Sequence, residues 1–306
     1  MNDVAASPQG ASVEAKVPRP SRAQRLRRWR TFPAPAAVGA AMLVSMLLFI
    51  VVVPMLPGYD PYRQDLAAGL ARPFESMAGL AFPLGSDALG RDLLSRLSLA
   101  SRVSFAIGAS AVAISLVTGL GLGLVAGYFR GPVEMVVMGI ADLQLAVPRV
   151  LLMIAVSAIL GPSVTVLTIL LGLTSWVSYG RVARSMALTL RHKEFVLSAT
   201  TQGASAWWNI RRHVLPNVMP QMVIIGTFEF GQVIMLEAAL SFLGLGIQPP
   251  LPSLGLMISE GQNDLAINPW ISILPGISIF LLVAGSQLFS QLFTSERQRA
   301  LLPAAL

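Results

Sequence analysis

The sequence has no cysteine anywhere in its 306 residues. This absence excludes disulfide bonds, zinc sites built from thiolates and a cysteine nucleophile, and it leaves the redox compartment unreadable. Charged residues are also scarce, at 12% of the chain, where a soluble globular domain has about 25%. With 54% hydrophobic residues and a mean hydropathy of +0.68, the composition indicates a polytopic membrane protein.

Motifs for enzymatic chemistry are missing as well. The sequence has no G-x-x-x-x-G-K-[ST] loop to hold nucleotide phosphates and no H-E-x-x-H zinc motif. Its only two histidines, His192 and His213, lie in a basic polar segment, where contact with solvent or phosphate is expected rather than catalysis. We therefore expect no catalytic residue, cofactor or metal site in this chain, and any ATP hydrolysis would come from a partner.

Long apolar runs are the main positive signal. A helix needs about 20 apolar residues to cross the ~30 Å hydrocarbon core of a bilayer. Six stretches qualify: Ala36–Met55, Val103–Tyr128, Val133–Leu160, Val164–Arg181, Val218–Leu243 and Ile271–Phe293. The first is longer than the ~7–15-residue apolar core of a cleavable signal peptide, so we interpret it as an uncleaved span. The sequence thus predicts an all-α protein with six transmembrane helices.

The positive charges predict the orientation. A net charge of +7 could suggest nucleic acid, but the Lys and Arg residues cluster beside apolar spans, which indicates contact with membrane lipid instead. Placing the N-terminus inside leaves 16 of them on the cytosolic side and five outside. Positive residues favour the cytosolic side, so both termini are expected there.

This orientation divides the chain into segments. They are a cytosolic basic tail (1–35), the first transmembrane helix (36–56), an outer, periplasmic loop (57–102), a core of five further helices (103–293) and a cytosolic C-terminal tail (294–306). The core includes a polar cytosolic loop at 184–216, between the fourth and fifth spans.

That polar loop contains EFVLSATTQGASAWWNIRRHVLPN, Glu194–Asn217. Its first half is predicted to be a helix that continues out of the fourth span from about Arg184, with Met186, Leu190 and Leu197 along one side. Gly203 is expected to end this helix, because glycine readily accepts the left-handed backbone that closes one.

The second half of the loop predicts another short helix. Ser205 can cap Ala206–Val214, in which Trp207, Ile210 and Val214 share a face, and Pro216 is expected to stop the helix before the next span. Two interpretations stay open. The segment is either an amphipathic loop at the lipid headgroups or a rigid elbow that docks into another protein.

Four ionisable residues fall within the predicted spans: Asp142, Arg149, Glu229 and Glu237. Each costs at least about 2.5–3.5 kcal/mol near the bilayer centre, so each is expected to face a cavity or a partner group. Asp142 and Arg149 are seven residues apart and should share a helical face, with Pro148 kinking the helix. Either these groups snorkel and bond to neighbouring helices, or Arg149 and Glu229 line a translocation path and bias which charged solute passes.

Small residues mark two further features. Gly119, Gly121, Gly123 and Gly127 have a spacing in the second span that permits close helix packing. Pro275–Gly276 is expected to interrupt the last span, either as a hinge for alternating access or as a tolerated kink.

Four stretches carry a resemblance to a known family. They are FPLGSDALGRDLLSRL (Phe82–Leu97), GLVAGYFRG (Gly123–Gly131), ALSFLGLGIQPPLPSLGLMISEG (Ala239–Gly261) and PWISILPGISIFLLV (Pro269–Val283). In this order and spacing, the chain resembles the inner-membrane permease subunits of bacterial ABC importers for dipeptides, oligopeptides and nickel. The resemblance covers roughly two thirds of the chain, from residue 82 to 283.

The resemblance implies a type I ABC importer fold, in which the cytosolic elbow seats in a cleft of a separate ATPase. Gly203 matches the family's motif glycine and Ala199 its second alanine, whereas Leu197 stands where a glutamate is usual. A charged contact is therefore not carried over to position 197, although Glu194 lies nearby. The implied docking residues are Glu194, Leu197, Ala199, Gly203, Ala204, Trp207, Ile210, Arg211, Leu215 and Pro216.

The resemblance also implies the partners. They are a second permease subunit in a heterodimer, two ATP-binding subunits that hold ATP and Mg, and a periplasmic solute-binding protein. The chain would be half of an importer in the bacterial inner membrane, working by alternating access on di- or oligopeptides. Import of chelated nickel or another small solute remains an alternative, and a secondary carrier, a channel or a membrane-embedded enzyme are more distant ones.

Overall fold

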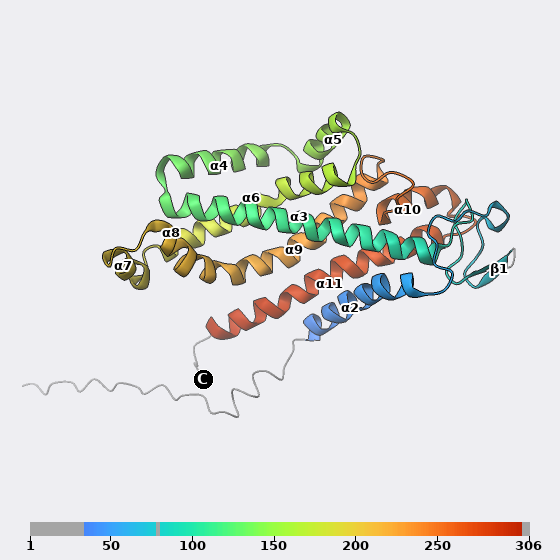
Figure 1. Cartoon of the computed structure of the whole chain (residues 1–306), viewed down its shortest axis with the longest axis horizontal. Coiled ribbons are helices and arrows are strands. Elements are labelled where there is room, and N and C mark those ends of the chain that lie inside the picture. Colours follow the sequence, from blue (N-terminus) through green and yellow to red (C-terminus); the bar gives the residue numbers. More distant parts are fainter. Residues whose placement is uncertain (1–33, 78–79, 302–306) are drawn as a thin grey trace, which may run out of the picture. The chain divides into compact units, whose positions relative to one another are not determined.

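The computed structural model describes residues 34–77 and 80–301. The predicted basic tail therefore lies almost wholly outside the described residues, and the predicted C-terminal tail is described only as far as residue 301. Helices make up most of the described chain, as predicted, and the short strands are confined to one hairpin (Figure 1).

The helices and strands are as follows. The longer helices are α2 (Ala34–Val52), α3 (Leu93–Phe129), α4 (Gly131–Ala146), α5 (Arg149–Leu160), α6 (Val164–Leu190), α9 (Leu215–Phe242) and α11 (Trp270–Leu301). The shorter elements are η1 (Val53–Met55), η2 (Leu66–Ala68), β1 (Glu75–Met77), β2 (Leu80–Phe82), α7 (Glu194–Thr201), α8 (Ala206–Asn209), the π-helical turn η3 (Ile210–Val214), α10 (Leu254–Gly261) and η4 (Gln262–Asp264).

All six predicted spans are helical, but the third is broken. Five helices among the described residues are long and apolar enough to cross a membrane, and α4 and α5 qualify only as a pair bent by 88°. The break falls at Val147 and Pro148, where the backbone is extended because proline disfavours helical conformation in the residue before it. The prediction that Asp142 and Arg149 share a helical face is therefore wrong.

Two other predicted boundaries differ from the structure. α3 begins at Leu93, well before Val103, because the Asp92 carboxylate accepts hydrogen bonds from the backbone N–H groups of Leu94 and Ser95 and caps the helix. The prediction that Pro275–Gly276 interrupts the last span is also wrong, since α11 continues through Pro275.

The closest packing joins α3 to α6. A Cβ atom added to Gly123 would lie 2.4 Å from the carbonyl oxygen of Gly180, and Cβ atoms at Gly119 and Gly127 would meet the α6 backbone just as closely. Only glycine permits this approach of two backbones. At Gly121, in contrast, nothing lies within 4 Å, so the packing prediction holds for three of the four glycines.

The remaining helices assemble around this pair. α9 packs against α3, α6 and α11, and α2 lies along α11, where Gly39 fits against the backbone near Phe289. Figure 1 shows α7 and α8 at one end of the bundle and the β1 hairpin with α10 at the other. The first turn of α2 and the last turns of α11 lie toward the same end as α7.

The α3–α6 contact gives a first prediction. Gly123→Val should disrupt it, because the added atoms collide with the α6 backbone rather than with a flexible side chain. We expect a loss of at least about 1–3 kcal/mol of stability, seen as a lower melting temperature in detergent. Gly121→Val is the matched control and should melt like the parent chain. Equal melting of both variants would contradict the assigned packing.

Candidate functional site

The polar stretch between α6 and α9 folds into two short helical arms, α7 and α8. Gly203 joins them with φ +89°, the left-handed conformation that its sequence position predicts. The N–H of Ala204 donates to the carbonyl of Ala199 and the N–H of Gly203 to that of Thr200, both at 3.0 Å. These two bonds are the helix-closing pattern that glycine permits, so the turn is fixed by backbone geometry.

Side chains tie the two arms together. Asn209 is buried and donates its Nδ2–H to Thr200 Oγ1 at 3.0 Å, linking the second arm to the first. The His213 ring lies 5.6 Å from the Phe195 ring and 5.1 Å from the Trp208 ring. The elbow, defined as residues 194–214, is therefore braced across its turn.

The second arm runs directly into α9. Ser205 Oγ caps it by accepting from the Trp208 N–H at 3.3 Å, as predicted. The helical path then continues through η3, in which the Leu215 N–H reaches the carbonyl of Ile210, five residues back. The prediction that Pro216 stops the helix is wrong: this wider turn comes just before the proline, whose missing N–H would break regular α-helical bonding.

The first arm also differs from its prediction. α6 ends at Leu190, and α7 begins afresh after a short link, so no single helix continues to Gly203. Leu197 is consequently 48% exposed rather than in line with the packed residues of α6. Trp207 is 62% exposed, while Ile210 is buried in the bundle, so those two do not share a buried face.

The elbow thus presents apolar side chains on its surface. Phe195, Leu197, Trp207 and Trp208 are exposed. The other predicted docking residues divide into three groups: Glu194, Gly203, Arg211 and Pro216 are exposed, Ala199, Ala204 and Leu215 are half-buried, and Ile210 is buried. Exposed aromatic and aliphatic groups on a braced support are typical of a protein-docking surface.

A second site lies within the spans, where Arg149 begins α5. Its guanidinium donates to Thr174 Oγ1 at 3.3 Å and to the Ser175 hydroxyl, and its Nη1 lies 4.0 Å from Glu229 Oε2. Glu229 Oε2 and the Tyr179 hydroxyl are buried and make no hydrogen bond within the described chain. Since burying such groups unbonded is costly, this cluster has spare capacity to bind a polar partner.

The bend between α4 and α5 positions Arg149. Gln144, at the end of α4, donates to the carbonyl of Thr174 at 2.8 Å and accepts from the Trp176 indole N–H at 2.8 Å. Both partners belong to α6, so the broken span is fastened to α6 on either side of the break. Sequence reasoning missed Gln144, because an uncharged amide in an apolar run carries no distinctive signal.

The other two ionisable candidates lie elsewhere. Glu237 is fully buried and accepts from Ser104 Oγ at 2.7 Å and from Ser241 Oγ at 2.9 Å, as the structural interpretation expects. Asp142 pairs with Arg181 at 2.6 Å in an exposed position. The structure therefore joins Arg149 to Glu229 and leaves Asp142 and Glu237 in separate local contacts.

At the opposite end of the bundle, four charges form a buried network. Arg96, whose side chain is 2% exposed, contacts Glu260 at 2.7 Å and Asp87 at 3.4 Å. Arg91 contacts the same two carboxylates at 3.2 and 2.6 Å. The network fastens the loop before α3 to α10. Sequence reasoning missed it, since Glu260 is far away in the sequence.

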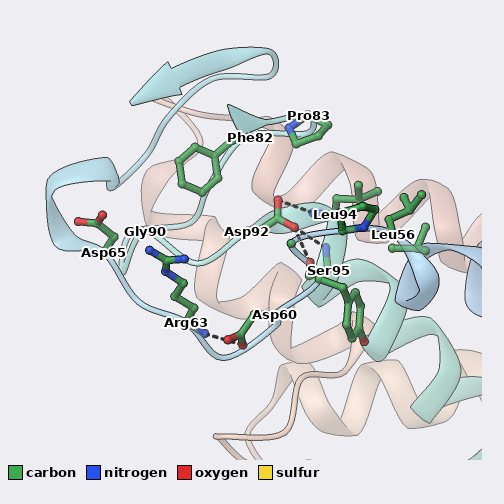
Figure 2. Close-up of a pocket in the computed structure, with 14 residues that line it drawn as sticks. Leu56, Asp60, Arg63, Asp65, Phe82, Pro83, Gly90, Asp92, Leu94 and Ser95 are labelled. Atoms are coloured by element: carbon green, nitrogen blue, oxygen red, sulfur yellow. Dashed lines mark hydrogen bonds between the residues drawn. The ribbon is translucent and has the colours of Figure 1, made fainter. Parts of the chain in front are cut away.

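A cavity of about 380 Å³ lies at the same end of the bundle (Figure 2). Three carboxylates on its lining, from Asp60, Asp65 and Asp92, cap local turns by accepting backbone N–H groups. Burial raises the pKa of the Tyr59 hydroxyl there, so the phenol stays neutral. No group of three or more His, Asp or Glu residues within 34–77 and 80–301 is placed to hold a metal. The three carboxylates on the lining shape the turns of the loop.

Apolar spans, a braced polar elbow at one end and an ion-paired loop at the other define the class of a multi-pass membrane protein. Residues 119–298 match the family described as binding-protein-dependent transport system inner membrane component, the membrane domain of type I ABC importers. The chain belongs to this family and is a multi-pass inner-membrane protein, so the resemblance seen in the sequence is confirmed.

Relatives match most of the chain. It is 35% identical to the dipeptide transport system permease protein DppC of Alkalihalophilus pseudofirmus, covering 82% of this chain and 81% of the relative. It is 36% identical to the glutathione transport system permease protein GsiD of Pectobacterium atrosepticum, covering 83% and 84%. A probable D,D-dipeptide permease, DdpC of Escherichia coli, is 34% identical over 91% and 93%.

The buried network gives a second prediction. Arg96→Met should leave two carboxylates short of a cation in a buried place, which costs about 3–5 kcal/mol. The expected result is a marked drop in melting temperature and in yield of the purified chain. Arg63→Met, an exposed arginine of the same outer loop, is the control and should leave both unchanged. Similar losses from both changes would point to overall charge instead.

Proposed function

We propose that this chain is one of two membrane subunits of an ATP-driven importer of short peptides and that it forms half of the translocation pathway. Membership of the importer family is the main support. The names of its relatives specify dipeptides, D,D-dipeptides and glutathione, and glutathione is itself a tripeptide. Peptide import is therefore the substrate class on which the relatives agree.

The remaining subunits follow from what this chain does not supply. The sequence has no phosphate-binding loop, so ATP and Mg would be held by two ATPase subunits that receive the elbow. A second permease would complete the pathway, and a periplasmic solute-binding protein would deliver cargo at the outer loops. In this arrangement both termini lie in the cytosol, on the side of the elbow.

The single observation that carries the mechanism is the unbroken helical path from elbow to span. α8, η3 and α9 form one helical segment from Ala206 to Phe242, and this segment includes Glu229. A push on the elbow by a closing ATPase would be passed along α9, which continues as a helix past Pro220 to Glu229. The Arg149–Glu229 pair would then change its spacing as the pathway alternates between its two openings.

The elbow's rigidity favours protein docking over lipid contact. An interfacial amphipathic helix lies in the headgroup plane along its own axis. Here, two short arms are bent around Gly203 and held by the Asn209–Thr200 bond, with apolar residues exposed on both arms. A compact knob of this kind suits a cleft in a partner protein.

Leu197→Asp tests the docking proposal. A carboxylate on the exposed face of α7 would be buried without a partner in the ATPase cleft. We expect at least about tenfold weaker co-purification of the ATPase subunits, equivalent to about 1.4 kcal/mol. Leu66→Asp makes the same change on an exposed leucine of the outer loop and should leave co-purification intact. Undiminished ATPase binding by Leu197→Asp would favour the lipid interpretation.

The intramembrane pair is proposed to contact substrate. A peptide carries an ammonium group and a carboxylate, and Glu229 and Arg149 supply the two complementary charges in a buried, incompletely hydrogen-bonded setting. Glu229 would attract the ammonium group as the peptide passes. Arg149, whose other donors are held by Thr174 and Ser175, would attract the carboxylate.

Glu229→Gln tests this assignment in a reconstituted importer. The preference for a peptide with a free N-terminus over its N-acetylated form should fall by about tenfold, the scale of one charge-assisted hydrogen bond. Glu237→Gln, on the same helix, should instead lower stability with the preference unchanged, because Glu237 bonds only within the protein. If Glu229→Gln leaves the preference as it was, the assignment fails.

A further inference from the structure

A basic hollow of about 730 Å³ lies where α3 ends, α4 begins and α6 passes, at the same end as the elbow. Three arginines line it, Arg130, Arg184 and Arg191, together with one carboxylate, Glu134. Its remaining wall is mostly apolar, with Phe129, Pro132, Met135 and Met138. Neither the docking elbow nor the Arg149–Glu229 pair uses this hollow.

The positive charges here are only partly neutralised. Arg184 is paired with Glu134 through both Nε and Nη2, with the Nε contact at 2.6 Å. Arg191 Nη1 donates to the carbonyl of Tyr128 at 2.6 Å and its Cζ lies 5.9 Å from the Tyr128 ring centroid, but no carboxylate among the described residues pairs with it. Arg130 lies 4.0 Å from Glu134, and its side chain is 57% exposed. With three guanidinium groups against one carboxylate, the hollow favours an anion.

The start of α4 adds to this potential. Arg130 and Gly131 both have left-handed backbone, with φ +61° and +60°, and no side chain caps the helix. The free N–H groups and the helix dipole of this 16-residue helix place partial positive charge beside the arginines. The start of α4 adds positive potential to the hollow, but the arginine side chains are the groups that would bind an anion.

An apolar strip leads away from the hollow along α4. Met135, which lines the hollow, is 74% exposed, and Val136, Ile140 and Leu143 further along the helix are exposed as well. A ligand that fits the whole feature carries a negative headgroup and a hydrocarbon chain. A soluble phosphate would satisfy only the arginines, and an uncharged lipid only the strip.

We propose that this hollow binds the phosphate of an anionic phospholipid from the cytosolic leaflet, with an acyl chain along α4. The choice of leaflet rests on the proposed orientation, in which the elbow end is cytosolic. Basic pockets at this depth of a membrane protein suit anionic headgroups. Because the Phe129 ring lies 5.6 Å from the Trp207 ring, the bound lipid would also support the elbow beside it.

The test uses the whole importer complex in nanodiscs of phosphatidylcholine with and without phosphatidylglycerol. Native mass spectrometry after delipidation should find phosphatidylglycerol retained by the parent complex. The double variant R130Q/R191Q should retain it about tenfold less, since two of the three guanidinium groups are gone. The control R181Q/K193Q removes equal charge from exposed positions outside both the hollow and the elbow and should retain lipid like the parent.

Three results would overturn the proposal. The first is equal retention by R130Q/R191Q and the parent complex. The second is equal stabilisation by inorganic phosphate alone, which would indicate a soluble anion. The third is loss of pairing between the two permeases in R130Q/R191Q with lipid retention unchanged, which would make the hollow a protein interface. Should the glutamine variant fail to assemble, R130K/R191K keeps the charge and is expected to keep the lipid.

Discussion

The backbone contact between α3 and α6 fixes the position of α6, which holds the broken span and leads into the elbow. Three glycines on one face of α3 let the α6 backbone come so close that its carbonyl oxygens occupy the space where side chains of α3 would otherwise lie. α6 then serves as a common support. Its middle, at Thr174 and Trp176, holds the broken span, and its end leads into the elbow. In a bilayer, where apolar contact alone drives little association, such close packing is what sets helix positions.

The elbow is joined to Glu229 by a continuous helical path. The elbow is closed by backbone bonds at Gly203, cross-braced at Asn209 and continuous with α9 through η3. Its inner side is anchored by Ile210 and Val214, which pack against α3 and α6. In the proposed mechanism, force applied at the elbow would reach Glu229 along a single helix that continues past Pro220. The unusual π-helical turn keeps that helix continuous up to a proline that would otherwise end it.

The sequence was sufficient for the features that depend on local chemistry. Apolar length gave six spans, glycine gave the left-handed turn at 203, and serine gave the cap at 205. Prediction from the sequence failed for features that depend on contacts between residues far apart in the chain. The kink at Pro148 was predicted, but the contacts by which Gln144 and Arg149 fasten the bent span to α6 were not. The partnership of Arg96 with Glu260 depends on how α10 folds back over the outer loop. No local pattern encodes those contacts.

The two charged clusters of the chain differ in how completely their charges are paired. At the end opposite the elbow, two arginines and two carboxylates pair with one another at 2.6 to 3.4 Å, and such a network fixes one geometry. Within the spans, Arg149 and Glu229 stand 4.0 Å apart, and two buried oxygens nearby make no bond. The proposed substrate site must bind and release a charged solute repeatedly, so its own protein cannot saturate it. The incomplete bonding at Glu229 is thus a cost to stability that a passing substrate is suited to relieve.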